Sequence, residues 1–187
     1  RCREFYMKDA YSFDINEDHA KSSYNKMFYA YLKTFNKLEL QAIPMAANTG
    51  PIGGDLSHEF IILADTGESN IYMDKSIFDI ELNNYNFESK SLEKMRNDFS
   101  SFYAVTDEKF DKENFEKNVK KENQISTKGI EVGHIFYFGD KYSKPLNCLV
   151  DLPEGKKAAV KMGSYGIGIS RLVGAIIETK FNNNVMK

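Results

Sequence analysis

Near the end of the chain, three glycines and one arginine have a spacing suited to a flat, anionic ligand. The segment GSYGIGISRL places Gly163, Gly166 and Gly168 directly before a segment of helical pattern, with Arg171 in its first turn. Glycines at a strand-to-helix junction leave the backbone bare, because no Cβ stands between that backbone and a ligand. A guanidinium beside them can stack on a base or bind phosphate bidentately.

The glycine spacing disfavours the two commonest nucleotide-binding loops. It reads G-x-x-G-x-G, whereas a dinucleotide-binding loop reads G-x-G-x-x-G inside a βαβ unit, and no such unit surrounds it. The GKS or GKT of a phosphate-binding P-loop is also missing from this segment. The ligand would therefore be bound in a different fold.

The start of the chain, RCREFYMKDAYSF, combines the same two chemistries. Charged residues alternate with rings in a stretch that we predict to be a strand over residues 3–13. The charges are Arg1, Arg3, Glu4, Lys8 and Asp9, and the rings are Phe5, Tyr6 and Tyr11. Such a strand can meet a ligand that has both an aromatic part and charged groups.

The elements that position these residues follow from the hydrophobic pattern. A helix begins after Asp14 or Asn16, either of which can cap it, and its apolar residues recur at helical spacing as far as Leu38. We predict that its aromatic residues belong to the core. Short strands follow at 40–47, where Pro44 indicates a sheet edge, and at 57–64, after a glycine-rich loop over 48–55. The segment at 70–74 is predicted to return as the hairpin partner of 57–64.

Residues 76–128 differ in character from the rest. They are rich in Lys, Glu and Asn, and we predict a small, mostly helical insertion between a first core segment (1–75) and a second (129–187). The second segment contains a strand at 129–139, a turn at 151–156, a strand over 158–166 and a closing helix. Strands outnumber helices and their connections resemble hairpins, so we predict an α+β fold with an antiparallel sheet flanked by helices.

Composition limits the classes of protein that fit. The 187 residues carry a formal net charge of −2, so the net charge does not indicate binding to a polyanion or an anionic membrane, and any nucleic-acid contact must come from a local patch. No apolar run approaches the ~18 residues of a membrane span. Cys2 and Cys148 are isolated thiols, which favours a reducing, cytoplasmic location. His19 and His58 have no metal-ligand partners at useful spacing, so we assign no metal to the protein itself.

Four segments together resemble one family. RCREFYMKD fits the second half of motif 2 of class II aminoacyl-tRNA synthetases, R-x-x-x-F-x-x-x-D, and GSYGIGISR resembles their motif 3. GPIGGDLSHEFIILADTGE and EVGHIFYFGDKYS are similar to segments of bacterial-type prolyl-tRNA synthetases, which belong to class IIa. The resemblance covers nearly the whole chain except the insertion, and four motifs occur in the family's order.

The resemblance implies an ATP site on an antiparallel sheet. Phe5 would stack on adenine, Arg1 would reach the outer phosphates, and Arg171 would cover the other adenine face or bind the γ-phosphate. Gly166 and Gly168 would lie beneath the nucleotide, and Glu131 would lie next to it. Mg²⁺ bridging the phosphates is expected. Proline would be activated to prolyl-adenylate and transferred to tRNA(Pro) by a cytoplasmic homodimer.

The same resemblance implies a small pocket for L-proline, whose imino group is cationic. It needs a carboxylate or a carbonyl for that nitrogen and apolar walls for the ring. The candidates are Asp9, Glu59, His134 and Phe136, with Phe60 a further wall. Each has a structural alternative: Asp9 as an ion-pair partner, Glu59 as a sheet-surface carboxylate, His134 as a hydrogen-bonded core histidine on the face of Val132 and Phe136, and Phe60 as core.

Two departures from the family shape the expectations. The first arm of motif 2, motif 1 and an anticodon-binding domain are not found in the sequence, so we expect a catalytic-core piece that cannot activate proline alone. The insertion is too short for the editing domain of many bacterial relatives, so we expect no hydrolysis of mischarged alanyl-tRNA in cis. A proline pocket cannot strongly exclude alanine, which leaves a need for editing elsewhere.

Two other functions remain open. One is another class IIa synthetase such as the threonyl enzyme, although the segments SHEF and VGHIF and the missing zinc-ligand set argue against it. The other is a non-catalytic synthetase paralogue that acts as a binding or regulatory module. Phe5 and Arg171, which such paralogues tend to lose, are both present.

Overall fold

The computed structural model describes residues 3–47, 56–182 and 185–186, and its centre is a seven-stranded sheet. Five strands pair in the order β1-β9-β6-β3-β2, every pair antiparallel, while β4 pairs with β6 and β5. The strands are β1 (Met7–Asp14), β2 (Ala42–Ala46), β3 (Leu56–Leu63), β4 (Ser69–Asp74), β5 (Ala104–Thr106), β6 (Gln124–Gly139) and β9 (Lys161–Gly168). The predicted α+β fold is confirmed, and β2 with Pro44 ends the five-strand order as expected.

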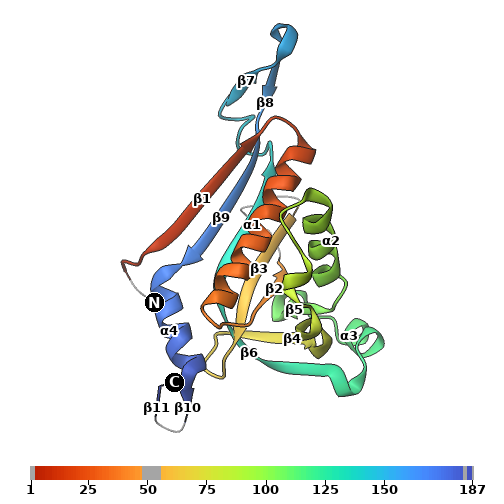
Figure 1. Cartoon of the computed structure of the whole chain (residues 1–187), viewed down its shortest axis with the longest axis vertical. Coiled ribbons are helices and arrows are strands. Elements are labelled where there is room, and N and C mark those ends of the chain that lie inside the picture. The colour runs from red at the N-terminus through yellow and green to blue at the C-terminus, as the bar shows by residue number, and fades with distance from the viewer. Residues whose placement is uncertain (1–2, 48–55, 183–184, 187) are drawn as a thin grey trace.

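Helix α1 (Glu17–Lys37) covers one face of the sheet (Figure 1). Asn16 is its N-cap, because the Asn16 side chain accepts a hydrogen bond from the His19 amide. Its aromatic residues are buried, as predicted, and Tyr24, Phe28 and Phe35 have exposed fractions of zero. Phe60 of β3 packs against Phe28, Tyr31 and Phe35 and is itself fully buried, so this ring belongs to the core.

The segment predicted as an insertion contains α2 (Ser89–Ser100), α3 (Lys112–Asn118) and the short 3-10 helices η2 (Lys75–Asp79), η3 (Leu82–Asn84), η4 (Asp107–Lys109) and η5 (Lys121–Asn123). Helix α2 packs beside α1 (Figure 1). Its buried residues Leu92, Met95 and Phe99 join the same hydrophobic cluster as the residues of α1 and the sheet. The boundaries 76 and 128 stay a prediction.

One predicted pairing is wrong: β3 and β4 do not form a hairpin. Both strands pair instead with β6, and Leu63 and Ser69 are both in register with Gly129. The connection between them passes very close to β6, because a Cβ on Gly67 would lie 2.3 Å from the carbonyl oxygen of Gly129. A long partner strand can accept two strands in succession, and local turn residues alone do not distinguish that arrangement from a hairpin.

The last part of the chain adds elements at both ends of the sheet. Strands β7 (Leu149–Asp151) and β8 (Lys157–Ala159) form an antiparallel hairpin around η6 (Pro153–Gly155), and this hairpin projects beyond the sheet (Figure 1). Helix α4 (Ile169–Lys180) follows β9 without a break at the opposite end. Strands β10 (Phe181–Asn182) and β11 (Val185–Met186) close the described chain.

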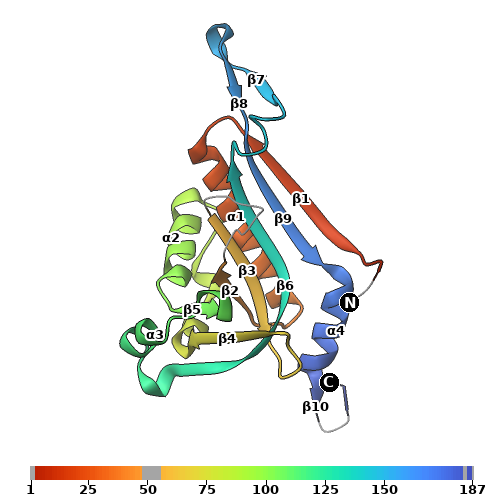
Figure 2. The same ribbon diagram turned by 180° about the vertical axis from the view of Figure 1, so that it is seen from behind.

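The second face of the sheet is open within the described ranges. Figure 2 shows β1, β9, β6 and β3 in front of α1 with no helix over them in the described residues. Helix α4 lies at the end of β9, beside this face rather than across it. Among the described residues, no helix is long and apolar enough to cross a membrane.

Candidate functional site

The open face of the sheet carries a row of four residues, one on each of four neighbouring strands. Glu59 of β3 is in register with His134 of β6, His134 with Gly166 of β9, and Gly166 with Asp9 of β1. Neighbouring strands lie about 4.8 Å apart, so the row spans about 14 Å. Residues in one register position point to the same face, so three polar side chains flank one bare glycine.

A cavity of about 710 Å³ lies over this row. It brings together eight of the eleven residues that the sequence predicts for the site, and of the other three Phe60 is buried in the core. Its lining includes Phe5, Asp9, Glu131, His134, Phe136, Gly166, Gly168 and Arg171. Glu59 contacts the lining residue His134 from the neighbouring strand, and Arg1 lies outside the described residues.

The residues just before β1 are held against the start of α4. The Tyr6 amide donates a 2.8 Å hydrogen bond to Ser170 Oγ, and the Ser170 amide donates to the Tyr6 carbonyl at 3.4 Å. These contacts place Phe5 at the cavity while 59% of its surface stays exposed. An aromatic ring left this exposed at a cavity wall is available for stacking with a ligand.

Gly166 and Gly168 form the part of the floor beside β1. A Cβ on Gly166 would lie 3.3 Å from Met7 Cε and 3.6 Å from the Asp9 carboxylate. A Cβ on Gly168 would lie 3.4 Å from the Arg171 Cβ and 3.9 Å from Met7 Sδ. A larger side chain at either position would occupy the space beside Asp9 and Arg171, so the two glycines leave that space free for a ligand.

Arg171 is held in place by acceptors from two other segments. Its Nη1 donates to the Glu131 carbonyl at 3.0 Å and lies 3.8 Å from the Glu131 carboxylate. Its Nη2 lies 3.1 Å from Oε1 of Glu68, which belongs to the connection between β3 and β4. Nearly half of the Arg171 side chain stays exposed, so the guanidinium still faces the cavity.

A β-bulge explains how Glu131 and His134 reach the same side of β6. Phe60 is in register with Gly133 and Ile61 with Glu131, so Val132 is an extra residue on β6. Residues three apart in a regular strand point to opposite faces, and the extra residue reverses that relation. As a result, Glu131 Oε1 lies 3.2 Å from His134 Nδ1. Val132 is buried and belongs to the cavity lining together with His134, and the expectation that the two share one face stays a prediction.

The His134 imidazole is fixed on both of its nitrogens. Nε2 lies 2.6 Å from Ser57 Oγ, and Nδ1 faces Glu131. Its ring stacks on Phe136, with centroids 3.8 Å apart and planes 18° from parallel. The side chain is 18% exposed and lines the cavity, so this histidine is both hydrogen-bonded and accessible.

Glu59 lies deeper than the other carboxylates. Its Oε1 is 3.8 Å from His134 Nδ1, and the side chain is 22% exposed. Burial raises the pKa of the Glu59 carboxyl; the negative charge of Glu131 adds to the rise and His134 opposes it. A cation nearby would offset the cost of ionising Glu59.

Glu59, Glu131 and His134 also form a possible ligand set for a cation. One ligand atom from each lies within 4.8 Å of the other two, and no other such group of His, Cys, Asp and Glu occurs in the described residues. Two carboxylates and an imidazole are common metal ligands. The expectation that the protein holds no metal of its own stays a prediction.

Sequence reasoning missed three contributors to the site. Ser57 sits in the predicted strand at 57–64 but carries no chemical signal of its own, and Glu68 falls in the short connection between two predicted strands. Ser170 is one residue from Arg171 and can be recognised only through its contact with Tyr6. Among the described residues, Asp9 has no ion-pair partner within 4 Å, although its charge raises the pKa of Lys8 against the larger effect of burial.

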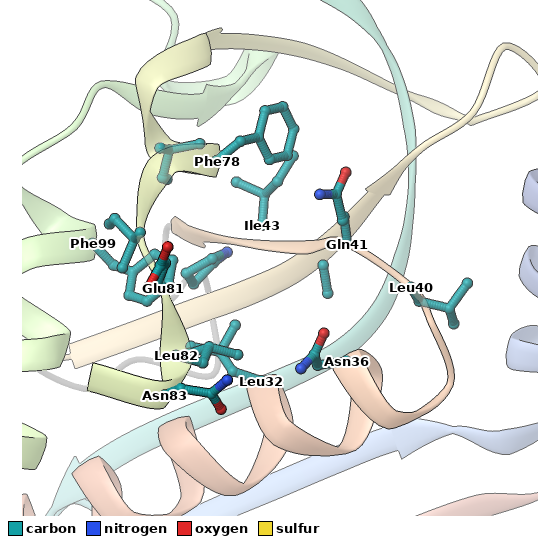
Figure 3. A pocket seen from close by; sticks show the side chains of 14 residues that line it. Leu32, Asn36, Leu40, Gln41, Ile43, Phe78, Glu81, Leu82, Asn83 and Phe99 are labelled. Carbon is teal, nitrogen blue, oxygen red and sulfur yellow. The ribbon is translucent and has the colours of Figure 1, made fainter. Parts of the chain in front are cut away.

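A second, smaller hollow lies elsewhere in the fold. It measures about 250 Å³ and lies among α1, the start of β2 and the segment from Ile77 to Asn83 (Figure 3). Leu32 and Asn36 come from α1, while Phe78, Glu81 and Leu82 come from the facing segment. Its lining contains no cationic residue and one carboxylate. An anionic nucleotide is therefore better accommodated by the larger cavity.

Comparison with known proteins identifies the family of this chain. Residues 1–180 match the family model described as tRNA synthetase class II core domain (G, H, P, S and T), so the chain belongs to the class II tRNA synthetase core family. Among curated proteins, it is 65% identical to the proline–tRNA ligase of Pelagibacter ubique over 189 residues, covering 100% of this chain and 43% of that protein.

Further relatives carry the same name. The chain is 52% identical to the proline–tRNA ligase of Hyphomonas neptunium, with 98% of this chain and 42% of the relative covered. It is 55% identical to that of Rhizobium etli, with the same coverage. The chain thus spans about two fifths of the length of these relatives.

Proposed function

We propose that this chain is the part of a proline–tRNA ligase that binds ATP and proline and forms prolyl-adenylate. The observation that carries the proposal is the joint position of Phe5 and Arg171 on one cavity, above the bare backbone of Gly166 and Gly168. The family model covers synthetases for five amino acids, and the names of the relatives favour proline among them.

The nucleotide would lie between Phe5 and Arg171. A purine stacked on an aromatic ring gains about 1–3 kcal/mol, and a guanidinium adds attraction to the adenine face or the γ-phosphate. Glu131 and Glu68 contact the edge of the Arg171 guanidinium, and contacts in that plane leave its faces for the ligand. Arg1, at the start of the same segment, is proposed to reach the outer phosphates.

Proline would lie on the part of the row near β6. The Glu59 and Asp9 carboxylates are candidates for its cationic imino group, and Phe136 offers an apolar surface beside His134. His134 is held by Ser57 and Glu131 and would border the ring or the carboxylate of proline. The row is long enough, at about 14 Å, for an amino acid beside part of a nucleotide.

The reaction has two steps in this proposal. A proline carboxylate oxygen attacks the α-phosphorus, the bond from that phosphorus to the bridging oxygen breaks, and pyrophosphate leaves. A hydroxyl of the terminal adenosine of tRNA(Pro) then attacks the prolyl carbonyl, and AMP leaves. The first step needs positioned reactants and neutralised charge more than a side-chain nucleophile.

Mg²⁺ would enter with ATP as part of the substrate and bridge its phosphates. Mg²⁺ prefers oxygen ligands, so the carboxylate of Glu131 at the cavity wall is its candidate protein ligand. Further parts of the proposal follow from the family: a homodimeric complete enzyme, a cytoplasmic location and no editing of alanyl-tRNA by residues 76–128.

The experiment is amino-acid-dependent exchange of pyrophosphate into ATP, measured on the complete protein with a panel that includes proline, alanine and threonine. We expect strong exchange with proline and weak exchange with alanine, which is smaller and fits the same pocket. Exchange with threonine in place of proline would identify another class IIa synthetase. ATP binding with no exchange for any amino acid would identify a non-catalytic paralogue.

A further inference from the structure

Glu68 makes a contact that no motif of the sequence accounts for. Its Oε1 lies 3.1 Å from Nη2 of Arg171, although the two residues are 103 positions apart (171 − 68) in the chain. Glu68 is itself 68% exposed and Arg171 46% exposed, so neither is forced into contact by burial. A contact between two accessible side chains depends on how well the backbone positions them.

The connection between β3 and β4 places Glu68 very specifically. The Gly67 amide donates a 2.9 Å hydrogen bond to the Ala64 carbonyl, which closes a tight turn. A Cβ on Gly67 would lie 2.3–2.5 Å from the backbone oxygen, carbon and nitrogen of Gly129. Only glycine can therefore pass so close to β6. This crossing delivers the next residue, Glu68, to the end of the site where α4 begins.

Arg171 has its two terminal nitrogens directed to different partners. Nη1 donates to the Glu131 carbonyl, which is backbone and cannot move independently, and Nη2 faces Glu68. A guanidinium is planar, so two fixed acceptors define its plane as well as its position. With one acceptor alone, the long Arg171 side chain could rotate about that single hydrogen bond.

We propose that Glu68 is a positioning residue that fixes the plane of Arg171 for the nucleotide. The inference rests on the proposed function, since it needs ATP at Arg171. Glu68 itself lies outside the cavity lining and touches no substrate. Glu68 orders Arg171 before ATP arrives, so Arg171 loses less conformational entropy when ATP binds. Removal of Glu68 should therefore weaken the binding of ATP and leave the binding of proline unchanged.

The test compares Glu68→Gln with a matched control, Glu39→Gln, in the complete protein. Glu39 is 80% exposed, and its Oε2 lies 2.6 Å from Nζ of Lys180. Lys180 is the last residue of α4, the helix that contains Arg171. Both variants remove one charge that tethers α4, and only Glu68 contacts Arg171. The readouts are KM for ATP, KM for proline and kcat in pyrophosphate exchange.

We expect Glu68→Gln to raise KM for ATP about two- to fivefold, the range of a partly exposed ion pair, with KM for proline unchanged. Glu68→Asp keeps the charge and should restore most of the loss, while Glu39→Gln should leave both constants unchanged. An unchanged KM for ATP in Glu68→Gln, or an equal rise in Glu39→Gln, would overturn the proposal.

Failure of the proposed function is separable from failure of this inference. If the wild-type complete protein shows no exchange with any amino acid, the proposed function is wrong. ATP affinity measured by calorimetry then decides the role of Glu68 by itself. A two- to fivefold weaker affinity in Glu68→Gln supports the positioning role, and equal affinities overturn it.

Discussion

Glu59 and His134 lie opposite each other in the ladder between β3 and β6, with Glu59 Oε1 3.8 Å from His134 Nδ1. The same nitrogen is 3.2 Å from Glu131, so one imidazole nitrogen faces two carboxylates. Two negative charges this close repel each other, and a bound cation relieves that repulsion. The inner end of the row is therefore suited to a cationic group such as the imino nitrogen of proline.

Glu59→Gln should weaken proline binding without lowering the stability of the protein. Burial raises the pKa of the Glu59 carboxyl in the folded protein, so ionisation of Glu59 favours the unfolded state. This destabilisation disappears as the pH falls below the ordinary pKa of a glutamate. In urea unfolding at pH 7, the glutamine variant should be at least as stable as the wild type. In proline titrations, it should bind proline more weakly. Glu93→Gln, at an exposed position on α2, is the control. Lower stability at pH 7 in Glu59→Gln would contradict this.

Ser57→Ala should loosen the His134 ring. The hydroxyl lies 2.6 Å from Nε2, and without it the ring keeps its stacking on Phe136 but loses one of two hydrogen bonds. We expect KM for proline to rise a few-fold, by about 1 kcal/mol of binding, with KM for ATP unchanged. Ser12→Ala is the matched control, since Ser12 bonds Tyr165 at 2.8 Å on the α1 side of the sheet. Equal effects of the two variants on KM for proline would refute the assignment.

Gly166→Val should block the site. A Cβ there already approaches Met7 and Asp9, and the two further methyl groups would extend into the cavity. We expect ATP affinity, measured by calorimetry, to fall at least about tenfold, because the valine side chain would displace the nucleotide from the backbone of β9. Gly174→Ala on α4 has open space around it and should stabilise the protein by about 0.5–1 kcal/mol without changing ATP affinity. Unchanged affinity in Gly166→Val would place the nucleotide elsewhere.

His58 should make the protein sensitive to acid. It is buried on the α1 side, with Nδ1 2.7 Å from the Tyr24 hydroxyl, and burial, reinforced by the positive charge of Arg96, lowers its pKa to about 3. The unfolded chain binds a proton near pH 6.5 and the folded one does not, so stability falls with decreasing pH by about 1.4 kcal/mol per unit between those values.

The check on His58 is urea unfolding at several pH values between 7 and 4. His58→Gln, which can still bond Tyr24, should lose that slope, while His19→Gln at an exposed position should keep it. Equal slopes in wild type and His58→Gln would show that other groups carry the acid sensitivity.

Much of this architecture could be predicted from the sequence. The helix that begins after Asp14 or Asn16 and the strand before α4 follow from periodicity, and the placement of Phe5 and Arg171 in one site follows from the motifs. The family resemblance supplied Glu131 and His134 as site residues, whereas strand alternation alone would place them on opposite faces. The bulge at Val132 unites them, and it arises from pairing with β3, which a single strand does not reveal.

Other features depend on contacts between distant segments. The pairing of β4 with β6 depends on the close approach of Gly67 to Gly129, and Glu68 reaches Arg171 because of it. A DTGES segment signals a turn whichever strand follows, so its composition predicts a hairpin as readily as the observed crossing. The roles of Arg1 and of the loop at 48–55 stay predictions, because both lie outside the described residues.

The central claim is that ATP binds between Phe5 and Arg171. The most direct measurement is calorimetric ATP affinity of the complete protein for the wild type, Phe5→Ala and Arg171→Ala, with Phe87→Ala on the insertion side as an equally exposed aromatic control. We predict a loss of about fivefold or more for each site variant, from 1–3 kcal/mol of stacking and cation contact, and no change for the control. Wild-type affinity in both Phe5→Ala and Arg171→Ala would contradict the account.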